Sequence, residues 1–155
     1  MMRRLCCPLT VLLALIIAAL VYVFVIRGQV QPASDGRTAI LLAPDERDLV
    51  LTEMRDFLKA LQQISQSIAD GDATTAVQAV RRVGAASQHQ VPPGLVGKLP
   101  LAFKRLGFDT HARFDELALN IEQFGDTAQA LPELADLMNN CTACHAAYRI
   151  DLEPQ

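Results

Sequence analysis

The sequence predicts an all-α fold, an antiparallel four-helix bundle with an N-terminal transmembrane helix. Three observations support this. Residues 9–26 are uncharged and almost wholly apolar, four later segments repeat apolar residues at helical spacing, and no segment shows a convincing β-strand alternation. Mostly short links between the four segments favour antiparallel packing of neighbouring helices. About 110 residues lie beyond the N-terminal region, which is enough for one hydrophobic core and therefore one domain.

Residues 1–27 are expected to be a transmembrane anchor or a signal sequence. The apolar run of eighteen residues spans about 27 Å as a helix, close to the thickness of a bilayer's hydrocarbon core. A cleaved signal usually has a shorter apolar core of about 7–15 residues and then a small-x-small site, and no good site follows here. Arg3 and Arg4 precede the run without an acid, so the N-terminus is expected inside and the remainder outside.

The charge of the chain argues against binding to nucleic acid. The whole sequence has a formal net charge of −3, and residues 1–31 hold three arginines and no acid, so the exported remainder carries −6. Neutralising phosphates requires Lys and Arg, and no run rich in them is present. The acidic surface instead favours protein partners with basic patches.

Residues 28–44 are expected to form a flexible linker, because they are rich in Gly, Pro, Ser and Asp and show no periodicity. The predicted bundle domain covers residues 45–155. Its first helix is expected at about 45–69, with Pro44 just before its start and Gly71 at its end. One face of this helix carries a mostly apolar stripe of Met54, Phe57, Leu58, Leu61, Ile64, Ser65 and Ile68.

Three further helices complete the predicted bundle. The second begins with Asp72 as its N-cap and ends before the double proline at Pro92. Residues 95–108, which include Pro100 and Gly107, are expected to be less regular, with room for one short helix. The expected bounds of the last two helices are 109 or 110 to about 125, and 127 or 132 to 152.

The most informative stretch is CTACH at residues 141–145, near the end of the chain. On a helix, Cys141 and Cys144 share a face, and His145 lies one turn from Cys141 on that same face. Two thioether bonds from the thiols to haem vinyl groups would lay the porphyrin edge along this face, within reach of the imidazole. The spacing therefore predicts covalent attachment of one haem c, with His145 as an iron ligand.

Three other interpretations of the motif are weaker. A structural zinc ion needs four ligands, and the only other histidines, His89 and His111, are far apart in sequence. A thioredoxin-like dithiol needs a strand before the motif and a helix after it, whereas this motif lies within or near the end of a predicted helix. The third alternative is a chance pairing of two buried thiols with a surface histidine.

CTACHAAYR, residues 141–149, resembles the C-x-x-C-H-x-x-Y/F-R signature of the class II cytochromes c, which are the cytochrome c-prime family and its low-spin relatives. That family carries its haem motif on the last helix of a four-helix bundle. LPLAF, residues 99–103, is similar to a Leu-Pro-x-x-aromatic segment before the family's third helix. The resemblance reaches most of residues 45–155, and only the haem signature is specific.

The resemblance implies a role for each residue of the motif. Cys141 and Cys144 would bind one haem c covalently, and His145 would be the proximal ligand of its iron. Arg149 would lie one helical turn beyond His145, near that residue or the haem propionates, because a guanidinium suits carboxylates. A solvated arginine at a helix end is the alternative. Tyr148 would pack against the porphyrin, and a homodimer is compatible with the resemblance because dimers are common in the family.

The chain departs from the family in two respects. The family is usually soluble and periplasmic with a cleaved signal, whereas this chain has a predicted anchor. The Arg-x-x-x-Met/Leu pattern of the family's first helix is not cleanly present, because Arg55 is followed at that spacing by Lys59. This departure leaves the sixth iron ligand open.

Met54 on the first helix is the best candidate for that sixth ligand, and the alternative is that it fills the core. Met138 is disfavoured because it lies seven residues before His145 on the same helix face, and so on the wrong side of the haem. His111 is a weaker candidate, expected to be solvated in the first turn of the third helix. His89, beside the double proline, is expected at the surface. An iron with no sixth ligand is the remaining alternative.

These features predict a monohaem c-type cytochrome that transfers single electrons at the periplasmic face of the bacterial cytoplasmic membrane, where c-type haem is attached. The expected partners are redox proteins with basic patches and, through the N-terminal helix, the membrane. The alternative is a five-coordinate cytochrome c-prime-like protein that binds small gases such as nitric oxide. If the N-terminal segment is cleaved, either protein would be soluble in the periplasm. An exported dithiol oxidoreductase is a third and weaker hypothesis. No catalytic constellation is visible, so no enzyme activity is expected.

Overall fold

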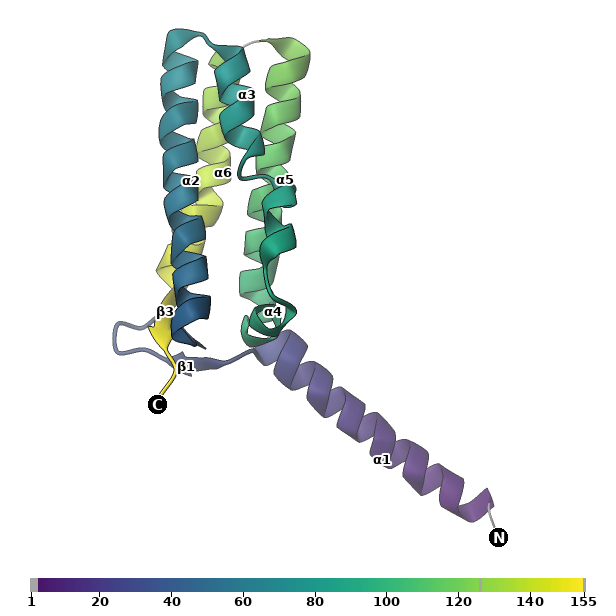
Figure 1. Cartoon of the computed structure of the whole chain (residues 1–155). Coiled ribbons are helices and arrows are strands. Elements are labelled where there is room, and N and C mark those ends of the chain that lie inside the picture. Colours follow the sequence, from purple (N-terminus) through teal and green to yellow (C-terminus); the bar gives the residue numbers. More distant parts are fainter. Residues whose placement is uncertain (1–2, 126, 155) are drawn as a thin grey trace.

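The structure of the chain is a computed structural model that describes residues 3–125 and 127–154, without the side chains of residues 3–7, 89, 90 and 128. It is mostly helical, with one small three-stranded sheet (Figure 1). The helices are α1 Arg3–Val21, the π-helix η1 Tyr22–Arg27, α2 Pro44–Asp70, α3 Ala73–Arg81, the 3-10 helix η2 Ala85–Gln90, α4 Pro93–Lys98, α5 Leu101–Phe124 and α6 Thr127–Ala147. The strands are β1 Val30–Pro32, β2 Thr38–Leu42 and β3 Tyr148–Leu152.

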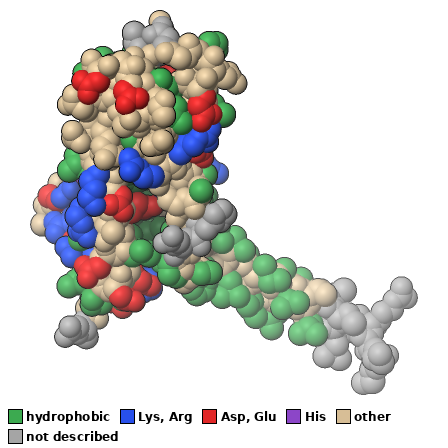
Figure 2. Space-filling view, turned by 45° about the horizontal axis from the view of Figure 1, so that its top comes forward, with side chains coloured by type: hydrophobic (Ala, Val, Ile, Leu, Met, Phe, Trp, Pro, Cys, Tyr) green, Lys and Arg blue, Asp and Glu red, His purple; other side chains and the backbone are tan. Residues whose placement is uncertain are grey.

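The N-terminal helix α1 and its continuation η1 form an apolar rod that projects from the rest of the chain (Figures 1 and 2). The stretch Pro8–Arg27 has a mean hydropathy of 3.1, is not buried within the protein, and is long and apolar enough to cross a membrane. A signal sequence near the N-terminus can meet the same criteria of length and composition, so this finding does not distinguish the two. Side chains such as Leu9, Leu15 and Phe24 are more than half exposed. An exposed apolar surface of this size is typical of a segment that contacts a membrane or another protein.

The ends of two predicted helices are confirmed. α2 ends before Gly71 and α5 before Gly125, and both glycines have left-handed backbones with φ of 68° and 62°. Glycine adopts this conformation without the steric penalty of a Cβ atom. The predicted cap of the next helix is also present, because Asp72 Oδ1 accepts a hydrogen bond of 3.0 Å from the backbone amide of Thr75 at the start of α3.

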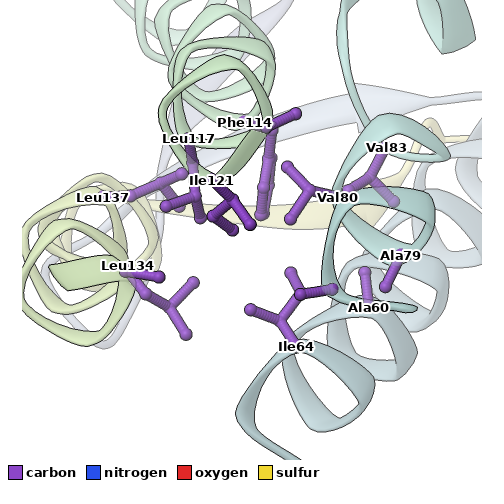
Figure 3. Packing of buried hydrophobic residues seen from close by; sticks show 13 residues of the cluster. Ala60, Ile64, Ala79, Val80, Val83, Phe114, Leu117, Ile121, Leu134 and Leu137 are labelled. Carbon is purple, nitrogen blue, oxygen red and sulfur yellow. The ribbon is translucent and has the colours of Figure 1, made fainter. Parts of the chain in front are cut away.

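The four helices α2, α3, α5 and α6 pack together around one hydrophobic core. Side chains from all four helices point toward a common centre, with Phe114 of α5 fully buried (Figure 3). Alanines at positions 60, 76 and 79 are buried where α2 meets α3, so these two helices can approach closely. This cluster, called here the helical core, consists of Ala60, Ile64, Ala76, Ala79, Val80, Val83, Phe114, Leu117, Ala118, Ile121, Ala130, Leu134 and Leu137.

Two predicted helix bounds in the middle of the chain are wrong. α5 begins at Leu101 rather than at Asp109, so residues that were expected to be irregular belong to a long helix. Gly107 lies inside that helix at a cost of about 1 kcal/mol relative to alanine, which the packing of α5 outweighs. The second predicted helix is too long, because α3 ends at Arg81 and a 3-10 helix follows it.

The prediction that the chain lacks β-strands is wrong. Strands β1 and β2 lie in residues 28–44, which were expected to be a flexible linker, and β3 replaces the expected last turn of α6. β1 pairs antiparallel with β2, and β2 pairs parallel with β3, so that Ala39 is opposite Arg149. The strands are three to five residues long, and β3 follows β2 by more than a hundred residues. A pairing between such distant short segments leaves no local periodicity to detect.

A second hydrophobic cluster, called here the base core, lies where the sheet meets α4 and the start of α2. It consists of the buried residues Ile40, Leu42, Val50, Leu95 and Leu99. The N-terminal helix joins the domain at this end, where Gly28 has a φ of 66° and a Cβ would clash with the Lys98 carbonyl oxygen. Gly28, which links the N-terminal helix to β1 beside the end of α4, is therefore a position that requires glycine.

Arg37, in the turn between β1 and β2, joins this hairpin to the end of α6. Its Nη1 donates hydrogen bonds of 3.3 Å to the carbonyl oxygens of His145 and Tyr148. Asp35 holds the guanidinium, with Nη2 and Nε at 2.7 and 3.0 Å from its Oδ2. The hairpin thus caps the helix end that carries the CTACH motif.

The pair of Asp35 and Arg37 should make stability depend on pH. The hydrogen bond from the Arg37 side chain, followed by the one from its backbone amide, lowers the pKa of Asp35 from 3.8 to about 2. Because the folded pKa is depressed, the ionised carboxylate stabilises the fold above about pH 4, and this contribution is lost as the pH falls through 2. We expect Asp35→Asn to lower the free energy of unfolding at about pH 5 and to lose most of that effect below about pH 2. Denaturant titrations at both pH values check this, and equal stabilities at pH 5 would contradict it.

Candidate functional site

The helical core and the base core leave an unfilled zone between them. Along α2, no residue between Val50 and Ala60 is buried. Two cavities of about 480 and 440 Å³ lie along this stretch. Protein interiors contain few voids larger than a water molecule, and both volumes fall in the range of small-molecule sites, about 300–1,000 Å³. This zone is therefore the candidate binding site.

The larger cavity, called here the thiol cavity, is lined by α2, α5 and α6. Cys141, Cys144 and His145 contribute from α6, and Met54 contributes from α2. The structure therefore brings these four residues to one cavity, together with His111, the weaker candidate ligand. Most of its other walls are apolar side chains of α2 and α5, namely Leu51, Phe57, Leu58, Leu61, Phe103 and Leu106.

The smaller cavity, called here the α4 cavity, lies between α2, α5 and the segment of η2 and α4. Five residues line both cavities and so form a common wall: Glu53, Phe57, Phe103, Gly107 and His111. The wall contains the two titratable groups Glu53 and His111 in otherwise largely apolar surroundings.

The two thiols of the motif are free and partly buried in the last two turns of α6. Burial raises the pKa of Cys141, and burial together with the charge of Cys141 raises the pKa of Cys144 to about 11. Both sulfurs are therefore protonated at neutral pH. A helix C-terminus does not stabilise a thiolate, because its dipole places negative charge there.

His145 lies at the exposed end of the thiol cavity, in the last turn of α6. Its ring makes no hydrogen bond or ion pair with any residue that the structure describes, so both nitrogens are free to bind a metal. Its backbone is fixed through the bond from Arg37 to its carbonyl oxygen. The structure thus holds the helix end in place and leaves the imidazole available.

Tyr148 and Arg149 follow the motif in β3 and do not line the thiol cavity. Tyr148 packs edge to face on Phe103, which does line it, with ring centroids 5.4 Å apart. Arg149 pairs with Asp151 at 2.8 Å and with Asp35 at 3.3 Å. The expectation that Arg149 lies one helical turn beyond the histidine is wrong, because α6 ends first. Its guanidinium already has two carboxylate partners.

His111 is buried in the interior of α5, so the expectation of a solvated histidine in a first turn is wrong. Its Nδ1 lies 2.8 Å from the Val83 carbonyl oxygen, and its Nε2 lies 3.2 Å from Glu53 Oε1. Burial acts to lower the pKa of His111, but the hydrogen bonds with Glu53 and Val83 and the charge of Glu53 outweigh it, and the pKa is raised. Neither ring nitrogen is free to bind a metal.

Two further hypotheses concern His89, which was expected at the surface, and a zinc ion bound at the motif. The side chain of His89 lies outside the described residues. Among the side chains that the structure describes, no group of three or more His, Cys, Asp and Glu is arranged to hold a metal ion. The structure therefore assembles no protein-only metal site around the motif in the part of the chain that it describes.

Sequence reasoning did not identify the pair of Glu53 and His111. The two residues are far apart in the sequence, and neither belongs to a recognisable motif. No protein-family model, no curated protein and no solved structure matches this chain. Its function is therefore argued from the thiol cavity and its surroundings.

Proposed function

We propose that this chain is a monohaem c-type cytochrome that transfers single electrons at the periplasmic face of the membrane. The observation that supports it most directly is that Cys141, Cys144 and His145 line one largely apolar cavity of about 480 Å³, to which Met54 contributes from another helix. Two thiols beside an imidazole at this spacing are the groups that attach and ligate a haem c.

The residues of the thiol cavity fit such a group. Its apolar walls suit the faces of a porphyrin, and its volume falls in the range of cofactor sites. Cys141 and Cys144 would form the two thioether bonds, His145 would be the proximal ligand, and Met54 would be the sixth ligand. A haem held there would supply reversible one-electron chemistry between ferric and ferrous iron.

The same proposal includes a finer fold and a location. We infer that α2, α3, α5 and α6 form an antiparallel four-helix bundle of the class II cytochrome c type, with the N-terminal helix as an uncleaved anchor. Arg3 and Arg4 would lie in the cytoplasm, and the domain would lie in the periplasm. The net charge of −6 outside the membrane would favour redox partners with basic patches.

The thiol geometry supports haem attachment over dithiol chemistry. Reactive dithiols usually lie at helix N-termini or beside cations, which stabilise the thiolate. Cys141 and Cys144 lie instead at the C-terminal end of α6, and each pKa is raised. This arrangement suits thiols that are consumed once during cofactor attachment.

Expression of the full chain together with haem-attachment machinery tests the proposal. We expect one haem per chain, retained after the protein is denatured and extracted with acid, and a low-spin ferric absorption spectrum. The membrane fraction should contain the coloured protein at its full length. A colourless product in which both thiols of the motif still react with alkylating agents would contradict the proposal.

A further inference from the structure

α2 is loosely held at the place where it carries Met54. Between Val50 in the base core and Ala60 in the helical core, residues 51–58 each line one or both cavities, and no residue of the stretch is buried. Tight packing normally fixes the rotation of a helix about its own axis. In this stretch the contacts with α5 therefore contribute more than usual to the direction in which Met54 points.

His111 supplies contacts between α5 and α2 in this stretch. Its Nε2 lies 3.2 Å from Glu53 Oε1, and its ring lies 5.0 Å, centroid to centroid, from the ring of Phe57. Phe57 in turn stacks on Phe114 of the helical core at 5.5 Å. One buried histidine therefore meets two residues of α2 on either side of Met54.

His111 is itself fixed on its other side. Its Nδ1 lies 2.8 Å from the carbonyl oxygen of Val83 and 3.3 Å from Ser87 Oγ. The residue is only 3% exposed, so rotation of its ring would leave buried polar groups without partners. The ring therefore has one orientation, and Glu53 is held by a rigid neighbour.

We propose that Glu53, held by His111, is a positioning residue that directs Met54 toward the iron side of the thiol cavity. Successive residues of an α-helix point about 100° apart, so fixing Glu53 against α5 fixes the direction of the next side chain. That direction is toward the cavity lined by Cys144 and His145. This inference rests on the proposed function and deepens it, because it explains how a stretch of α2 in which no residue is buried presents a ligand.

The test compares three variants of the full haem-loaded chain. Glu53→Ala removes the contact with α5, and its side chain is one-third exposed, so the domain should still fold. Glu53→Gln is the conservative rescue, because an amide can hydrogen bond to Nε2 without the charge. Asp56→Ala is the matched control, since this acid lies on the same helix and its ion pair among the described residues is with Lys59 of α2 rather than with α5.

We expect all three variants to retain one covalent haem per chain, measured after denaturation. Only Glu53→Ala is expected to change the spin state of the iron. Glu53→Ala should shift the ferric haem from mainly low-spin to mainly high-spin and lower its reduction potential, whereas Glu53→Gln and Asp56→Ala should keep the parent spectrum. A low-spin spectrum in Glu53→Ala, or an equal shift in Asp56→Ala, would overturn the inference and leave the proposed function standing. A parent chain without covalent haem would overturn the proposed function and this inference with it.

Discussion

A chain in which both Cys141 and Cys144 are replaced by alanine is expected to lose all covalently bound haem. In the proposed function each thiol would supply one thioether bond, and these are the two cysteines that line the thiol cavity. The histidine that remains can hold iron only by a reversible coordinate bond. Denaturing the purified protein and measuring the haem that stays with the chain gives the result directly. We expect one haem per parent chain and none per double variant.

The chain contains its own matched control for this experiment. Cys6 and Cys7 are the other two cysteines and precede the apolar run. In the proposed orientation they lie on the cytoplasmic side, so replacing both with alanine should leave covalent haem unchanged. Single replacement of Cys141 or Cys144 should leave one thioether bond and a reduced yield. Covalent haem in the variant that lacks both Cys141 and Cys144 would show that another residue attaches it.

The helices of the domain could be predicted because their signals are local. Asp72 and Gly71 lie beside each other between two helices, and each acts through the backbone of the adjoining turn. Gly125 ends α5 in the same way. The apolar stripe of α2 likewise depends on spacing within one segment. Caps and stripes of this kind do not require knowledge of the tertiary structure.

The sheet could not be predicted because its signals are not local. β2 is five residues long, and its neighbour β3 comes from the other end of the chain. Tyr148 also fits the helical spacing of the preceding motif, so the sequence continues the helix through it. Pairing with β2 and the bonds from Arg37 at the end of α6 override that local preference.

The candidate site divides in the same way. The motif could be named from its spacing, and Met54 from its helical spacing together with the family resemblance, and the structure brings them to one cavity. The burial of His111 could not be predicted, because it depends on contacts with Val83 and Glu53 from two other parts of the fold. Arg149 was placed near the haem by extending a helix that ends earlier. Residues that act through distant partners are thus the ones that the sequence leaves undetermined.

Met54→Ala is expected to convert the ferric haem from low-spin to high-spin in essentially every molecule. Met54 lines the same cavity as His145 and comes from a different helix, so in the proposed function its removal would take away the sixth ligand. Met/His ligation raises the potential of a haem, and the variant should therefore have a lower reduction potential. Absorption spectra of the ferric and reduced forms, with a potentiometric titration, measure both effects.

Met138→Ala is the control for that substitution, because Met138 is 40% exposed on α6, the helix that carries His145. It should leave the spectrum and the potential unchanged. The open distal position of Met54→Ala should also bind nitric oxide more readily than the parent protein does, since no side chain competes for the iron. A parent protein that is already high-spin would mean that Met54 does not bind, and would favour the gas-binding alternative. A low-spin spectrum in Met54→Ala would instead assign the sixth position to another residue, because a low-spin iron requires a strong ligand on both faces of the haem.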